Sequence, residues 1–76
     1  MFSYTIEKSA NARAFARTCR MIESNFSGIR KEPLLEDVDG TTIQVYRHNG
    51  KKIKVYNDYE VDAVYIDSEI ELKNVI

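Results

Sequence analysis

The chain has few of the residues on which catalytic and metal sites depend. Its 76 residues include one cysteine, one histidine, one proline and no tryptophan. The single cysteine, Cys19, excludes an internal disulfide framework and favours a reducing cytoplasm. The sequence holds no P-loop, dinucleotide fingerprint or nucleophile–base pair. We therefore expect a protein that is not an enzyme and that has no cofactor and no metal site.

Long apolar runs are also missing. No segment approaches the roughly 20 apolar residues of a membrane span, and Met1-Phe2-Ser3-Tyr4 is not the start of a signal peptide. Hydrophobic residues make up 43% of the chain and charged residues 30%, which is typical of a folded globule and not of a disordered segment. We expect one domain, residues 1–76, in a cytoplasmic protein that does not act on membranes.

Charge of neither sign dominates. Lys and Arg number 11 against 12 Asp and Glu, a formal charge of −1, which gives no general attraction to nucleic acid or membranes. The distribution is uneven, because residues 1–31 carry six basic and two acidic side chains, whereas residues 32–76 carry five and ten. The acidic residues between 58 and 71 have three interpretations: a mimic of phosphates, a weak Ca²⁺ site or solvated strand charges.

The first two elements follow from a change of hydrophobic period. Residues 2–7 alternate apolar and polar side chains, which predicts a strand. From Ala10 to Asn25 the period is that of an amphipathic helix, with Ser9 as its N-cap. Glu23 falls inside the apolar arc, so either the helix frays there or the carboxylate has a partner. The arc comprises Ala12, Phe15, Ala16, Cys19, Ile22 and Phe26.

Strand patterns follow the helix, separated by turn signals at Asp39-Gly40, Asn49-Gly50 and Asn57-Asp58. They predict strands before the first turn and between the turns, with a further one over residues 61–66. The tail, residues 68–76, is ambiguous. Ser68 to Glu71 matches a capping box and favours a short helix, whereas the alternation around Ile70 favours a last strand, which we prefer.

The loop around Asn49-Gly50 decides which side chains face the core. A two-residue loop would put the apolar residues of its two strands on opposite faces. A three-residue loop that starts at His48 pairs Ile43 with Val55 and makes one face wholly apolar. We therefore predict the three-residue loop and one core, formed by Phe15, Cys19, Ile22, Ile43, Val45, Ile53 and Val55.

The element order β-α-β-β-β-β predicts a small two-layer α+β domain. One amphipathic helix would pack on an antiparallel sheet of about four to five strands. This fold serves many unrelated tasks, so it carries almost no functional information.

Two groups of residues are candidate contact sites. Arg13, Arg17 and Arg20 form a stripe on the helix face away from the core, with Met21 beside it. Their forked donors suit phosphates or acidic side chains, although three arginines also make an ordinary solvated face.

The second group lies at the predicted hairpin, where Tyr46, Arg47, Lys52 and Lys54 interleave an aromatic ring with basic side chains. The three-residue loop places Tyr46, Lys52 and Lys54 on one outward face. Such a ribbon suits bases and phosphates. Lysines also protect protruding hairpins from edge-to-edge aggregation, which is the structural alternative.

The sequence therefore predicts a non-catalytic binding module of adaptor or inhibitor type that acts on a protein partner through a charged surface. Small proteins of this kind are typical of phage or mobile-element accessory genes. The alternative is nucleic-acid binding through the arginine stripe and the hairpin. A homodimer through an exposed strand edge is a further expectation, since a small open sheet has two edges.

Overall fold

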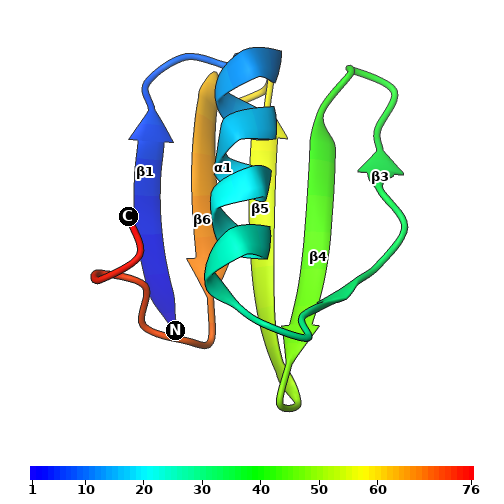
Figure 1. Cartoon of the computed structure of the whole chain (residues 1–76). Helices are drawn as coiled ribbons and strands as arrows, with labels where there is room; N and C mark the ends of the chain where they lie inside the picture. The colour runs from blue at the N-terminus through cyan, green and yellow to red at the C-terminus, as the bar shows by residue number, and fades with distance from the viewer.

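The computed structural model describes all 76 residues as one helix packed on one sheet (Figure 1). The first strand, β1 (Phe2–Glu7), leads into the only helix, α1 (Ala12–Asn25). All later elements are strands. They are β2 (Arg30–Lys31), β3 (Leu35–Glu36), β4 (Thr42–His48), β5 (Lys51–Asp58) and β6 (Ala63–Ser68).

The sheet is antiparallel and has the strand order β1-β6-β5-β4-β2, with β3 also pairing with β4. The predicted class, a two-layer α+β domain with one helix on an antiparallel sheet, is confirmed. The sheet has six strands instead of four to five, because the connector after α1 contributes β2 as well as β3. Each of these two strands has only two residues.

The start of α1 is set by polar side chains. Asn11, not Ser9, is the N-cap, and its side-chain oxygen accepts a hydrogen bond of 3.0 Å from the Ala14 N–H. The Asn11 N–H in turn donates to Oδ1 of Asn57 on β5, at 2.8 Å. This anchor to the sheet explains why the helix begins two residues later than the apolar period predicts.

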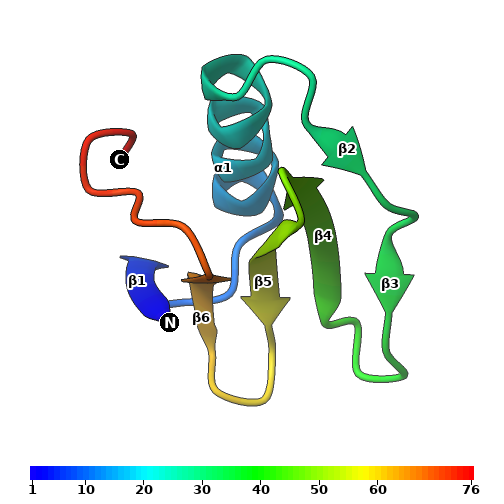
Figure 2. The same cartoon turned by 90° about the horizontal axis from the view of Figure 1, so that it is seen from below.

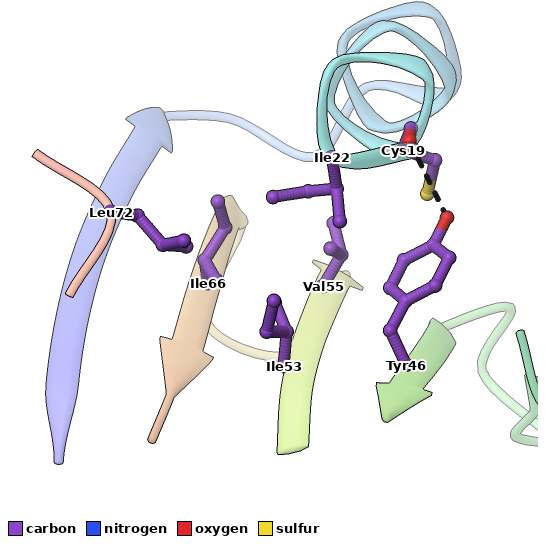
Figure 3. Close-up of a cluster of buried hydrophobic side chains, with 7 residues drawn as sticks. All are labelled: Cys19, Ile22, Tyr46, Ile53, Val55, Ile66 and Leu72. Atoms are coloured by element: carbon purple, nitrogen blue, oxygen red, sulfur yellow. Dashed lines mark hydrogen bonds between the residues drawn. The ribbon is translucent and has the colours of Figure 1, made fainter. Parts of the chain in front are cut away.

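The core lies between α1 and one face of the sheet (Figure 3). Four of the predicted core residues belong to this cluster, whereas Phe15 is half-buried at its margin. Ile43 and Val45 lie outside this cluster, on the opposite face of the sheet. Val45 is buried there, as predicted, whereas Ile43 is only half-buried. The cluster comprises Cys19, Ile22, Tyr46, Ile53, Val55, Ile66 and Leu72.

The predicted three-residue loop is wrong. His48 pairs with Lys51, so the loop is the two-residue Asn49-Gly50 turn. Both loop residues have positive φ, +53° for Asn49 and +80° for Gly50, as a type I′ turn requires. The left-handed preference of this dipeptide outweighs the segregation of apolar side chains, since both faces of β4 tolerate them.

The C-terminal segment after β6 forms neither the preferred strand nor the alternative helix. It bends back at Ser68, whose Oγ accepts a hydrogen bond from the Ile70 N–H at 2.9 Å. Leu72 is fully buried, and its N–H donates to the Tyr4 hydroxyl at 2.7 Å. A local turn and one buried anchor hold this segment on the α1 side of β1 (Figure 2).

The two faces of the sheet have different neighbours (Figure 2). We name the face that packs against α1 the covered face and the other the open face. Strand pairing assigns the side chains, because directly opposed residues point to the same side. Tyr46 pairs with Ile53 on the covered face, and Ile43 pairs with Tyr56 on the open face.

Candidate binding surfaces

The three stripe arginines lie on the exposed side of α1, as their helical spacing predicts. Arg13, Arg17 and Arg20 are all exposed, and the two ion pairs of the structure involve other basic residues. The stripe therefore presents guanidinium groups with no carboxylate partner within the chain. Such groups retain their full capacity for bidentate contacts with a carboxylate or a phosphate.

The buried stripe of α1 is rotated from the predicted arc. Ala14 is 1% and Thr18 is 3% exposed, whereas Ala12, a member of the predicted apolar arc, is exposed. The Thr18 hydroxyl donates to the Ala14 carbonyl at 2.8 Å, which satisfies it inside the fold. Small side chains at these positions let α1 lie close to the sheet. Met21 is consequently half-buried, not fully outward as predicted.

Met21 lines an open groove beside the arginine stripe. The groove has a volume of about 430 Å³ and lies where α1 faces β1 and the chain end. Its apolar lining comes from Met21, Ile6 and Ile76, and its one charged side chain is Arg17. The sequence carries no signal that Ile6 and Ile76 lie beside α1, because their proximity to the helix depends on the path of the C-terminal segment.

The hairpin candidates separate onto the two faces of the sheet. Tyr46 is 0% exposed and belongs to the core, so its predicted role in contacting a partner is wrong. Arg47, Lys52 and Lys54 lie on the open face, since Arg47 opposes Lys52 and Lys54 opposes Val45. The cause is the two-residue loop, which shifts the pairing by one residue and moves Tyr46 to the other face.

A row of large side chains crosses the open face. In strand order it runs from Tyr65 on β6 to Tyr56 on β5, Ile43 on β4 and Leu35 on β3, each opposing the next. We name these four residues the aromatic ridge. The rings of Tyr56 and Tyr65 are stacked, with centroids 4.5 Å apart and an interplanar angle of 11°. Leu35 is 53% exposed.

Most basic side chains of the open face lie on one side of the ridge. Toward the β4–β5 hairpin, the open face carries a row in which Arg30 opposes Arg47 and Arg47 opposes Lys52. Glu32 pairs with the guanidinium of Arg47. Toward the β5–β6 turn, Asp58 opposes Ala63. Asp67, opposite Lys54, is an acidic residue within the basic region, so the contrast of charge along the strands is between Lys52 and Asp58.

The other acidic residues do not form one surface. Asp67 lies on the open face opposite Lys54. Asp62 accepts a backbone N–H bond of 2.8 Å from the segment before α1, and Glu69 accepts one of 2.7 Å from β5. Asp62 and Glu69 therefore hold neighbouring backbone segments in place, whereas Asp67 accepts a hydrogen bond from the Ser3 hydroxyl.

Two tyrosine–carboxylate pairs link elements of the fold. The buried Tyr46 hydroxyl donates to Glu23 Oε2 at 2.5 Å, and Lys31 Nζ lies 3.2 Å from the same oxygen. The hydrogen bond from Tyr46 lowers the pKa of Glu23, while burial and the Glu23 contact raise the pKa of Tyr46. On the open face, Tyr65 donates to Asp58 at 2.8 Å and lowers its pKa in the same way.

The partner expected for Glu23 is therefore present, and α1 does not fray there. Tyr46 was missed as that partner because the wrong hairpin loop placed it outside. The sequence signal for this pairing is a carboxylate inside an apolar helical arc, together with a tyrosine in a strand of β-forming residues.

The single cysteine and histidine occupy structural positions. Cys19 is buried, and burial raises the pKa of its thiol, which makes it a weak nucleophile. His48 is half-buried and packs edge-on against Phe26, with ring centroids 5.2 Å apart. No three His, Cys, Asp or Glu side chains are grouped so that they could hold a metal ion.

Comparisons of this chain with models of protein families, with curated proteins and with solved structures find no match. No helix combines the length and the apolar character that crossing a membrane requires.

Proposed function

We propose that this protein is a non-catalytic binding module that docks an acidic segment of a protein partner along the outer side of α1. The observation that carries the proposal is the arginine stripe, Arg13, Arg17 and Arg20, which is exposed and unpaired and borders an apolar groove. Charge and apolar surface are adjacent there, as in many protein interfaces.

The stripe offers a spaced set of anion sites on a rigid element. At a rise of ~1.5 Å per residue, Arg13 and Arg20 are about 10 Å apart along the helix axis. An acidic segment lying along α1 could place carboxylates against successive guanidinium groups in bidentate contacts. Because the helix backbone is already ordered, docking restricts only the side chains.

The groove supplies the apolar part of the contact. Met21 is flexible and polarisable and adapts to different apolar shapes, and Ile6 and Ile76 extend the apolar lining. A volume of about 430 Å³ suits one or two bulky side chains of a partner. The preferred ligand is therefore an acidic segment with an apolar anchor residue.

The arrangement of basic residues favours a protein over nucleic acid as the partner. Lys52 and Lys54 lie on the open face, on the far side of the sheet from α1. A nucleic acid bound along α1 would not reach them at the same time. Tyr46, the ring expected to stack on bases, is buried. The arginine stripe and the hairpin residues therefore do not form the single surface on which the nucleic-acid alternative depends.

The test is fluorescence anisotropy with a labelled synthetic peptide of Asp, Glu, Ser and Gly that carries one central Leu. We expect the full-length chain to bind it, and Arg17→Glu to weaken binding at least about tenfold, since charge-assisted contacts contribute roughly 1.5–3 kcal/mol. Replacing the peptide's Leu by Ala should weaken binding as well. Lys52→Glu is the matched control on the open face and should bind within about twofold of wild type.

Two results would contradict the proposal. The first is that Arg17→Glu binds the peptide as tightly as wild type does. The second is that the chain does not bind the peptide and instead binds generic DNA or RNA in an electrophoretic shift assay, with an affinity that falls steeply as the salt concentration rises. The second result would support the nucleic-acid alternative.

A further inference from the structure

We infer that the open face of the sheet is a self-association surface, on which a second copy of this chain packs face to face about a two-fold axis. This surface lies on the far side of the molecule from the arginine stripe (Figure 2). The inference therefore does not depend on the proposed function.

The aromatic ridge gives the apolar centre of such a contact. α1 covers only one side of the sheet, so the ridge has no layer packed on it from its own chain. Ile43, Tyr56 and Tyr65 are only partly buried, and Leu35 is 53% exposed. An apolar row that crosses four strands is more than the isolated exposed side chains of ordinary surfaces and is typical of an interaction site.

The charges around the ridge are self-complementary. In a two-fold contact every pair occurs twice, because residue i of the first copy contacts residue j of the second and residue j of the first contacts residue i of the second. An axis parallel to the plane of the sheet and perpendicular to the strands brings the basic end of one copy onto the end of the other that carries Asp58. If the axis passes over the central row, where Gln44 pairs with Val55, Lys52 of each copy faces Asp58 of the other, because both are three residues from Val55.

The same axis matches the interior of the contact. Lys54 faces Tyr56 of the second copy, since both are one residue from the central row. The alkyl chain of Lys54 can lie on the ring while its ammonium makes a cation–π contact. Two sheets packed in this way would form an aligned sandwich, in which the strand directions of the two sheets differ by less than about 30°.

The area of the open face limits the expected affinity of the dimer. Five strands about 4.8 Å apart and up to eight residues at ~3.3 Å each give a contact of roughly 20 by 26 Å. This is smaller than the ~800 Å² per partner of a stable complex. We therefore expect a weak dimer that dissociates on dilution.

The test is sedimentation velocity over a roughly hundredfold range of protein concentration. Wild type should shift from monomer toward dimer as concentration rises. Lys52→Glu and Asp58→Lys should each weaken association at least about tenfold, because each puts like charges in contact twice. Their equimolar mixture should associate as wild type does, since opposite charges then meet at both contacts. Lys73→Glu, an exposed change outside the open face, controls for net charge.

Asp58 also accepts hydrogen bonds in the β5–β6 turn, so thermal unfolding must show that Asp58→Lys still folds. Ile43→Glu provides a second variant, which should abolish the dimer while Lys73→Glu does not. The inference is overturned by a monomer at every concentration, or by a mixture that associates no better than either variant alone. If the Lys52 and Ile43 variants dimerise as strongly as wild type, the two copies pair through the β1 edge instead. If the chain stays monomeric and binds a generic single-stranded oligonucleotide through the open face, that face binds nucleic acid.

Discussion

The two faces of the same sheet contain similar residues but give them different roles. Tyr46 and Tyr56 both lie in the middle of long central strands, yet Tyr46 is fully buried under α1 and Tyr56 is only partly buried on the open face. Tyr46 donates its hydroxyl hydrogen to Glu23 of α1, whereas Tyr56 stacks on Tyr65. The covered face stabilises the fold, and the open face keeps apolar surface available for contact.

Alternation along β4 and β5 explains why both faces are apolar in part. Ile53 and Val55 point to α1, and Ile43 and Val45 point to the open face. A sheet with one solvated face normally alternates apolar and polar residues. On β4 the open face departs from this pattern, because Ile43 and Val45 are both apolar.

The largest expected effect is a difference in stability between matched substitutions on the two faces. Ile53→Ala removes a fully buried side chain from the core and should lower the free energy of unfolding by about 2–5 kcal/mol. That is a large part of the roughly 4–11 kcal/mol expected for a domain of this length. Ile43→Ala, the matched change on the open face, should cost less than about 1 kcal/mol. Urea denaturation of the two variants measures the difference.

If Ile43→Ala destabilised the chain as much as Ile53→Ala, Ile43 would belong to the core, as the three-residue loop requires. The comparison of these two isoleucines therefore also tests the strand register.

A smaller effect concerns the hairpin that assigns side chains to the two faces. Asn49 has φ +53°, which alanine adopts at a cost of about 1 kcal/mol. Asn49→Ala should lower the melting temperature by several degrees, and Asn49→Gly should leave it nearly unchanged because glycine adopts positive φ freely. The opposite order in calorimetry would indicate a loop in which residue 49 has negative φ.

The smallest expected effect is the contribution of the two tyrosine–carboxylate pairs, one on each face, to the loss of stability in acid. Hydrogen bonds from Tyr46 and Tyr65 lower the pKa values of Glu23 and Asp58 in the folded chain. Carboxylates of this kind stabilise the fold above their unfolded pKa, and this contribution is lost as pH falls through the lower folded pKa. Glu23→Gln and Asp58→Asn should each flatten the loss of stability below about pH 4–5.

Each contribution should stay below about 1 kcal/mol, because both carboxylates are partly solvated. Unfolding curves recorded at several pH values measure it. A variant whose stability falls with acid as steeply as that of wild type would show that its hydrogen bond does not contribute.

The fold class was predictable because it depends on strong local patterns. The helical period around Cys19 and Ile22 and the alternation in β1 and β4 determine one helix on an antiparallel sheet. The hairpin register was not predictable from apolar alternation alone, because Asn49-Gly50 prefers a two-residue turn regardless of which face receives Ile43. The C-terminal segment was mispredicted because one buried side chain, Leu72, anchors it without a regular element.

The candidate sites were predictable only where they lie on one element. The arginine stripe follows from spacing within α1 and is exposed as expected. The groove and the aromatic ridge join residues distant in the sequence, such as Ile6 with Met21 and Tyr56 with Leu35. Their assembly depends on strand order and register, which single-strand patterns do not specify.

The most direct test of the division between the two faces is the amide NMR spectrum of the full chain recorded during dilution. We expect concentration-dependent shifts in β4, β5 and β6, strongest around Ile43, Lys54 and Tyr56, and no shifts on the exposed side of α1. Shifts confined to β1, or a spectrum independent of concentration, would contradict the assignment of the open face as the surface of self-association.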